Sequence, residues 1–278
     1  MPRELEKYQL IERSLIKKYR KEIWNPFIAG VKRYEMINDG DKIAVCISGG
    51  KDSMIMANLL RHLQRISDTK FELVYLVMDP GYNKGNRERI EQNAKLMNIP
   101  LTVFESDIFD SVNGMGGSPC YICARMRRGH LYAKAKELGC NKIALGHHFS
   151  DVIETTLLGM MYGAQIQAML PKLHSTNFEG MELIRPMYCV HEDAIIAWKN
   201  YNGLEFIQCA CRFVEKRDSS EDGIGESKRQ EIKQLIRELK KTNPMVESNI
   251  FNSIHNVNVD TMPAYKINGR EISFLDNF

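Results

Sequence analysis

The feature that most constrains this chain is a change of hydrophobic period across two glycines. Residues 42–48 carry β-branched side chains at alternate positions, as in a buried strand. Gly49 and Gly50 follow at once, and residues 53–64 then carry apolar side chains at helical spacing. A strand that passes through a glycine turn directly into a helix predicts an α/β domain with a binding site at that turn.

The same alternation continues along the chain. Further strand-like runs occupy 71–79, 101–105, 142–147 and 183–186, and helical patterns occupy 87–97, 121–138 and 150–161. Strands that alternate with helices indicate a doubly wound parallel sheet. We therefore divide the chain into an N-terminal helical segment (1–38), a sheet domain (39–215) and a C-terminal helical region (216–278).

Length and composition exclude some classes of protein. The 278 residues are 44% hydrophobic and 26% charged, which is ordinary for a globular protein. No apolar run approaches the roughly 20 residues that cross a bilayer, and the N-terminus lacks the apolar stretch of a signal peptide. We therefore expect a cytoplasmic protein with no membrane partner. The net charge of +3 does not by itself indicate a nucleic-acid partner, although basic runs at 17–21 and 125–128 suit phosphate contacts.

The segment 48–53, Ser-Gly-Gly-Lys-Asp-Ser, has the chemistry of an anion cradle. Its glycines let the backbone approach a phosphate closely, and the helix start offers free N–H groups and a positive dipole end. Lys51 adds a cation, and Ser48 and Ser53 add hydroxyl donors. The segment is not a Walker loop, because Val45 stands where that motif has its first glycine and an aspartate replaces its Ser or Thr.

A carboxylate in this segment has chemical consequences. The negative charge of Asp52 repels a triphosphate unless a cation bridges the two. Asp52 therefore implies Mg²⁺ near the phosphates or a role in proton transfer. Met78 ends the next strand at the same edge of the sheet, where it would lie near a nucleotide base, although a plain core methionine is the alternative. For the whole segment, the alternative is a glycine-rich turn that binds no ligand.

A second strand-to-helix junction, residues 145–155, carries histidines and acidic residues. Its sequence is Leu-Gly-His-His-Phe-Ser-Asp-Val-Ile-Glu-Thr. His147 is expected at the carboxyl edge of the sheet, and Asp151 and Glu154 stand one turn apart on one helix face. An ordinary helix cap would also explain the two carboxylates. The adjacent His148 is assigned no role.

Seven cysteines in a chain with no secretion signal argue against a disulfide framework. Cys120 and Cys123 have the spacing that lets two sulfurs bind one metal, and Cys209 and Cys211 form a second pair far along the chain. Four thiolates could close a structural zinc site. Three could hold a [4Fe-4S] cluster and leave one iron open to an exogenous sulfur atom. The remaining cysteines are interpreted as small buried hydrophobes: Cys46, Cys140 and Cys189.

Three segments resemble those of known families. Residues 48–53 resemble the PP-loop of the ATP pyrophosphatase superfamily, and residues 145–155 resemble that superfamily's Gly-His-x-x-x-Asp-x-x-Glu-Thr. The string Pro-Cys-Tyr-Ile-Cys-Ala-Arg-Met-Arg-Arg-Gly at 119–129 resembles the Cys-x-x-Cys-x-Arg-x-Arg-Arg-Gly signature of the tRNA 2-thiocytidine synthetase (TtcA-like) family. The similarity covers residues 30–215. One departure is Cys-Ala-Cys at 209–211, where the family often has Cys-x-x-Cys.

The resemblance implies an adenine nucleotide alpha hydrolase-like fold and an ATP-dependent tRNA sulfurtransferase. Such an enzyme adenylates the C2 oxygen of a pyrimidine, here a cytidine, and replaces it with sulfur, forming AMP and pyrophosphate. The implied catalytic residues are Asp52 and Lys51. The implied contacts to ATP and Mg²⁺ are made by Ser48, Gly49, Gly50, Lys51, Asp52, Ser53, Met78, Gly146, His147 and Asp151. The implied ligands of the [4Fe-4S] cluster are Cys120, Cys123 and Cys209, with Cys211 as an alternative third or fourth ligand.

The implied partners are tRNA and a sulfur donor, either a cysteine desulfurase or free sulfide, and a homodimer is one expected assembly. Arg125, Arg127 and Arg128 are expected to contact RNA phosphates or to position the base. Two other functions remain open. One is a PP-loop adenylating enzyme with a structural zinc site that acts on another tRNA base or a small molecule, passing nitrogen instead of sulfur. The other is a redox-sensing, nucleotide-binding protein with no enzymatic activity.

Overall fold

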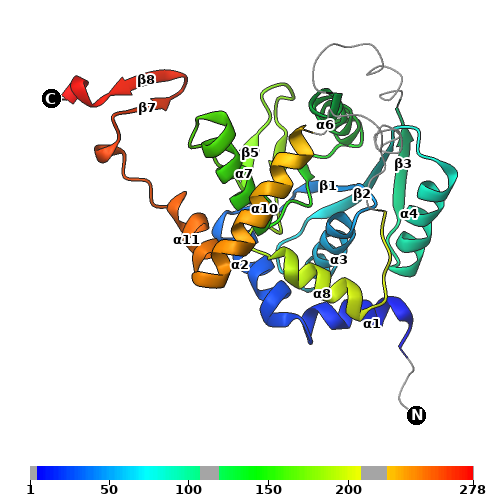
Figure 1. Ribbon diagram of the computed structural model, residues 1–278. Coiled ribbons are helices and arrows are strands. Elements are labelled where there is room, and N and C mark those ends of the chain that lie inside the picture. The colour runs from blue at the N-terminus through cyan, green and yellow to red at the C-terminus, as the bar shows by residue number, and fades with distance from the viewer. Residues whose placement is uncertain (1–4, 107–118, 208–223, 278) are drawn as a thin grey trace. The chain divides into compact units, whose positions relative to one another are not determined.

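The computed structural model describes residues 5–106, 119–207 and 224–277 (Figure 1). The chain forms two compact units. The first contains Met1–Val152 and Met169–Ile224, and the second contains Ile153–Ala168 and Gly225–Phe278. None of the described helices combines the length and the apolar character that a membrane span requires.

A six-stranded sheet forms the centre of the first unit. Its strands are β1 (Lys42–Ile47), β2 (Glu72–Asp79), β3 (Leu101–Glu105), β4 (Lys142–Ala144), β5 (Lys172–His174) and β6 (Glu182–Ile184). They lie in the order β3-β2-β1-β4-β6-β5, and every neighbouring pair is parallel except β5 with β6. The predicted parallel α/β sheet is therefore confirmed, with one short antiparallel strand added at its edge.

Helices cover the sheet of the first unit and connect its strands. They are α1 (Lys7–Ile16), the π-helical turn η1 (Arg20–Trp24), α2 (Asn25–Arg33), α3 (Lys51–Ile66), α4 (Lys84–Leu96), α6 (Pro119–Glu137), the start of α7 (Phe149–Gly163) and α8 (Glu192–Tyr201). Helix α3 packs against β1 and β2, and α6 packs against β2 and β4. Ala44 and Cys46 of β1 share a buried cluster with Tyr132 and Ala135 of α6. The alternate residues of β1 are also buried, so the strand is apolar and buried from Ile43 to Ile47.

The sheet order reverses direction between β1 and β4, which are hydrogen-bonded neighbours. After β1 the chain forms β2 and β3 on one side of β1. It then crosses to the other side, where β4 lies next to β1 and β6 lies next to β4. In an open α/β sheet, ligands bind outside the carboxyl ends of the strands at such a switch point. The segments 48–53 and 145–155 follow these two strands directly.

The second unit is mainly helical but ends in a hairpin. It contains the rest of α7, α10 (Ile224–Thr242), α11 (Val246–Ser253), η2 (Val259–Thr261), β7 (Ala264–Ile267), β8 (Arg270–Ser273) and η3 (Phe274–Asn277). Within this unit Glu154 is buried, and its carboxylate lies 3.3 Å from Arg229 Nη1 and 3.7 Å from Lys233 Nζ of α10. The antiparallel pair β7–β8 was not predicted from the sequence.

Candidate nucleotide site

The glycine loop, residues 48–53, joins β1 to α3 in a conformation that only glycine suits. Gly49 has a φ of +83°, and a Cβ there would lie 2.6 Å from side-chain carbons of both Ile90 and Ile207. Ser53 closes the loop, because its Oγ accepts the Ser48 N–H at 3.1 Å and donates to the Gly50 carbonyl at 3.0 Å. The first amides of α3 have no carbonyl partner within the helix, which leaves them for an anion.

The segment after β4 approaches this loop closely. A Cβ on Gly146 would lie 3.1 Å from both the Asp52 carbonyl carbon and the Ser53 nitrogen. Helix α7 then begins with a reciprocal cap: the His148 N–H donates to Asp151 Oδ2 at 3.0 Å, and the Asp151 N–H donates to His148 Nδ1 at 3.4 Å. The two strand ends and their two helix starts therefore meet at one place.

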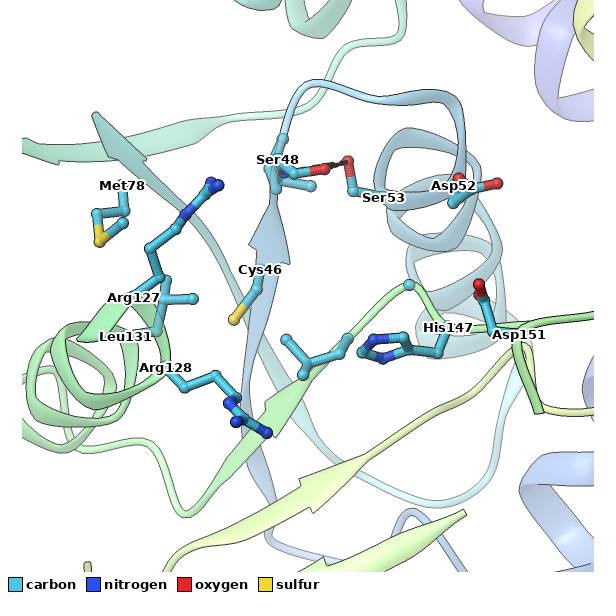
Figure 2. A pocket seen from close by; sticks show the side chains of 13 residues that line it. Cys46, Ser48, Asp52, Ser53, Met78, Arg127, Arg128, Leu131, His147 and Asp151 are labelled. Carbon is cyan, nitrogen blue, oxygen red and sulfur yellow. Dashed lines mark hydrogen bonds between the residues drawn. The ribbon is translucent and has the colours of Figure 1, made fainter. Parts of the chain in front are cut away.

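A cavity of about 570 Å³ opens where they meet (Figure 2). It is lined by Cys46, Ile47, Ser48, Asp52, Ser53, Met78, Arg127, Arg128, Leu131, Leu145, Gly146, His147 and Asp151. Figure 2 shows Met78 and Arg127 on the side of α6, with Asp52, His147 and Asp151 opposite them. Cations and apolar side chains on one wall, facing carboxylates and loop amides on the other, suit a charged nucleotide with an apolar base.

The cation of the glycine loop does not line this cavity. The Nζ of Lys51 lies 3.1 Å from Asp52 Oδ2 and 2.9 Å from Glu192 Oε1. Burial alone would lower the pKa of Lys51, but the two carboxylates outweigh burial and raise it. Lys51 therefore carries its full charge at neutral pH.

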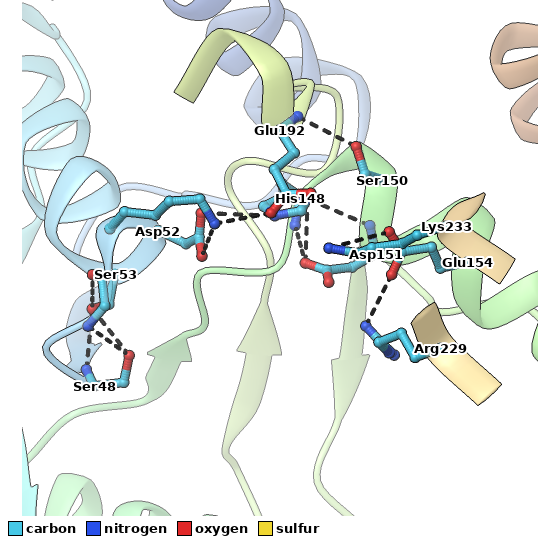
Figure 3. A network of polar contacts seen from close by, with 12 residues as sticks. Ser48, Asp52, Ser53, His148, Ser150, Asp151, Glu154, Glu192, Arg229 and Lys233 are labelled. Atoms are coloured by element: carbon cyan, nitrogen blue, oxygen red, sulfur yellow. Dashed lines mark hydrogen bonds and ion pairs between the residues drawn. The ribbon is translucent and has the colours of Figure 1, made fainter. Parts of the chain in front are cut away.

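His148 lies at the centre of a polar network beside the cavity (Figure 3). Its side chain is 3% exposed. The ring places Nδ1 3.3 Å from Asp151 Oδ2, and Nε2 3.7 Å from Asp52 Oδ1 and 4.0 Å from Glu192 Oε1. One imidazole thus contacts carboxylates that follow three different strands.

Comparisons with known proteins agree with this geometry. The family model described as PP-loop domain matches residues 14–211. The tRNA-cytidine(32) 2-sulfurtransferase of Geobacter sulfurreducens is 35% identical over 240 residues, which cover 85% of this chain and 90% of that protein. The chain belongs to this PP-loop family. The protein of the same name from Cellvibrio japonicus is 36% identical over 255 residues, which cover 88% of this chain and 79% of that protein.

A solved structure supports the PP-loop fold. The U34-tRNA thiolase NcsA from Methanococcus maripaludis, determined with its [4Fe-4S] cluster, aligns with a TM-score of 0.65 at 19% identity. The alignment covers 87% of this chain and 80% of that chain. The glycine loop is the PP-loop of this family.

The structure brings most of the nucleotide-binding residues expected from the sequence to one cavity. Those that line it are Ser48, Asp52, Ser53, Met78, Gly146, His147 and Asp151. Gly49, Gly50 and Lys51 shape the loop but do not line the cavity. The sequence did not point to Glu192 or to His148, since an isolated acidic residue and a second histidine carry no local signal. The position of Glu192, at the first helix start after β6, was the only available hint.

Two arginines lie in the wall of the PP-loop cavity, and a third, Arg185, interacts electrostatically with one of them. Arg127 and Arg128 of α6 line the cavity, and their expected contact with RNA stays a prediction. Arg185 follows β6 and is buried, and its guanidinium donates to the Leu170 carbonyl. Burial, with a contribution from Arg128, lowers the pKa of Arg185 to about 10, so this side chain is still charged at neutral pH.

The cysteines divide into two groups. Cys120 and Cys123 belong to the first turn of α6, and their side chains, like Cys209 and Cys211, lie outside the described part of the chain. Cys46 and Cys140 are buried, as expected, and burial raises the pKa of Cys46 to about 12. Cys189, also expected to be buried, is only partly buried. Within the described residues, no group of three or more His, Cys, Asp or Glu side chains is arranged to hold a metal.

Proposed function

We propose that this chain is an ATP-dependent tRNA sulfurtransferase that replaces the C2 oxygen of a cytidine with sulfur. The observation that carries the proposal is the cavity at the carboxyl ends of β1 and β4, where the glycine loop meets the segment 145–155. The relatives described above are named for cytidine 32 of tRNA, and we propose the same nucleotide here.

The chemistry requires ATP because the C2 oxygen of a pyrimidine is a poor leaving group. In the first step this oxygen attacks the α-phosphorus of ATP, the bond to the β-phosphate breaks, and pyrophosphate leaves. In the second step a sulfur nucleophile attacks C2, and AMP leaves with the former C2 oxygen. The sulfur comes from a donor, which we expect to be a cysteine desulfurase or free sulfide.

The glycine loop would bind the phosphates of ATP. The first-turn amides of α3 and the ammonium of Lys51 supply the positive charge that stabilises pyrophosphate as it departs. Asp52 Oδ1 is buried and accepts no hydrogen bond from any described residue, which fits a carboxylate that awaits a cation. Asp52 would help to hold Mg²⁺, which would offset the negative charge of the phosphates. Met78 lies on the cavity wall where it can contact the adenine.

Three thiols of this chain fit the proposed cluster. Cys123 stands one helical turn before Arg127, which lines the cavity. Cys209 follows Ile207 by two residues in the sequence, and the Ile207 side chain lies against Gly49 of the glycine loop. In the sequence, Cys123 is thus close to a residue of the cavity wall, and Cys209 is close to a residue beside the glycine loop. Cys120, Cys123 and Cys209 would hold a [4Fe-4S] cluster, which would supply the iron chemistry of sulfur transfer.

The proposal is tested by nucleoside mass spectrometry of tRNA from a strain that lacks this gene. We expect 2-thiocytidine to disappear and to return when the wild-type gene, but not Asp52→Asn, is supplied on a plasmid. Immunoblotting of the variant checks that it accumulates to the wild-type level. An unchanged 2-thiocytidine content in the deletion strain would exclude cytidine thiolation as the function. The expected homodimer, the cytoplasmic location and the three-part division of the chain stay predictions.

A further inference from the structure

The loop cation Lys51 is paired away from the cavity that its neighbours line. Ser48, Asp52 and Ser53 all line the cavity, but Lys51 does not. Its Nζ is instead 2.9 Å from Glu192 Oε1, on a helix that starts 141 residues further along the chain. In this arrangement the glycine loop presents its amides to an incoming anion while its ammonium is held by α8.

Glu192 is a well-anchored partner for this ammonium. It is the first residue of α8, and its backbone N–H donates to Ser150 Oγ at 3.3 Å, which ties it to the start of α7. Its side chain is 19% exposed, and its Oε1 also lies 4.0 Å from His148 Nε2 (Figure 3). A carboxylate anchored in this way fixes where the flexible lysine side chain ends.

The triphosphate of ATP must compete with this carboxylate. Lys51 lies between two anions, Asp52 and Glu192, which together outweigh its single positive charge. To reach the phosphates, the ammonium has to break its ion pair with Glu192. The free energy of that ion pair therefore makes the binding of ATP less favourable. Asp52 is the sequence neighbour of Lys51 on α3, whereas Glu192 belongs to another helix.

We propose that Glu192 is a positioning residue that holds Lys51 in a resting position and releases it when ATP binds. This inference rests on the proposed function, because it assigns the phosphates of ATP to the glycine loop. Glu192 acts through Lys51 and does not itself contact the reacting atoms. It sets the affinity for ATP by stabilising the free enzyme.

The test is the dissociation constant for ATP, measured by calorimetry on the anaerobically purified full-length protein with Mg²⁺ and without tRNA. Glu192→Gln removes the charge but keeps a hydrogen-bond acceptor, and Glu192→Ala removes both. We expect the Gln variant to bind ATP about three- to five-fold more tightly than wild type, and the Ala variant at least as tightly as the Gln variant. A merely structural role for Glu192 would weaken ATP binding, so a gain in affinity separates the two roles.

Two controls make the test specific. Asp193→Asn removes the same charge from the same turn of α8 and should leave the affinity unchanged. In a Lys51→Met background, Glu192→Gln should have no effect, because the residue it acts through is gone.

Three outcomes would overturn the inference: unchanged or weaker ATP binding in folded Glu192 variants, equal tightening in Asp193→Asn, or equal tightening in the Lys51→Met background. If wild type binds ATP and Lys51→Met binds it more weakly, the proposed nucleotide site stands whatever the Glu192 variants do. If wild type binds no ATP, the proposed function fails first and this inference fails with it.

Discussion

Gly146 determines how closely the segment after β4 approaches the start of α3. The atoms that a Cβ would meet, 3.1 to 3.3 Å away, belong to the backbone of Asp52 and Ser53, so no side-chain rotation can relieve the contact. The first turn of α3 would have to shift by a few tenths of an ångström. That turn carries the amides and the carboxylate on which the proposed chemistry depends.

We therefore predict that Gly146→Ala lowers the rate of cytidine thiolation about ten-fold or more. The free energy of unfolding should fall by only about 1–2 kcal/mol, because one tight contact is introduced into an otherwise intact core. Thiolation assays and urea unfolding measure the two effects. Gly85→Ala is the matched control, since its Cβ would have no neighbour closer than 3.7 Å. Wild-type thiolation by Gly146→Ala would show that this close approach is unimportant.

Site residues could be predicted where the motif that carries them is continuous in the sequence. Asp52 and Asp151 stand in strand-to-helix junctions, and both reach the cavity as expected. Glu192 and His148 could not be identified in this way, because what matters is their distance from residues far along the chain. A short distance such as that from Glu192 to Lys51 is produced by the packing of α8 on α3, and no spacing in the sequence encodes it.

At the scale of elements, length and period decide what can be predicted. The run before the glycine loop and the amphipathic α3 are long, periodic and confirmed almost to the residue. Strand β5 has three residues, too few for a period to appear. The hairpin β7–β8 did carry a local signal, Asn268-Gly269, whose φ values of 53° and 79° suit a tight hairpin turn. This signal is weak because each flanking strand has only four residues, too few to establish an alternating pattern.

The N-terminal helix α1 is joined to α3 by one buried carboxylate. Glu12 Oε1 lies 2.6 Å from His62 Nδ1, Oε2 lies 3.3 Å from Arg61 Nη2, and Arg65 also donates to this carboxylate. Burial alone would raise the pKa of Glu12, but His62 and the two arginines outweigh it and hold the pKa below the ordinary 4.5. The body of the helix that begins with the glycine loop is thereby held in place.

We predict that Glu12→Gln lowers the free energy of unfolding by about 2–3 kcal/mol near neutral pH, because it removes the buried counter-charge of Arg61 and Arg65. A folded-state pKa below 4.5 means that Glu12 stabilises the protein above that pH and loses its contribution as the pH falls through the lowered value. The difference between variant and wild type should therefore shrink in acid. Urea unfolding at several pH values measures it.

The control for this carboxylate is an exposed ion pair. Glu88 lies 3.9 Å from Lys84 on the surface of α4. Glu88→Gln should change the free energy of unfolding by no more than about 0.5 kcal/mol. A Glu12→Gln penalty that is equally small, or that does not depend on pH, would mean that solvent already screens the Glu12 cluster.

At the scale of the whole molecule, the sheet order decides where the site lies. Alternating strands and helices predict parallel pairing, but the order of strands depends on which side of β1 each crossover packs. The sequence does not reveal that choice. The observed order makes β1 and β4 neighbours, and only this adjacency turns two separate motifs into one cavity.

The cysteines lead to a prediction about cofactor content. Metals and clusters bind thiolates, and burial raises the pKa of Cys46 and Cys140, so these two thiols are poor ligands. Cys120, Cys123 and Cys209 are the ligands that we propose for a [4Fe-4S] cluster. We therefore expect the anaerobically purified protein to be brown, with about four irons and four sulfides per chain.

Cys120→Ala, Cys123→Ala and Cys209→Ala should each lose the colour and most of the iron, whereas Cys211→Ala and the control Cys140→Ala should keep both. Loss of iron in Cys211→Ala but not in Cys209→Ala would reassign the third ligand, and a colourless wild-type protein with one bound zinc would exclude the cluster.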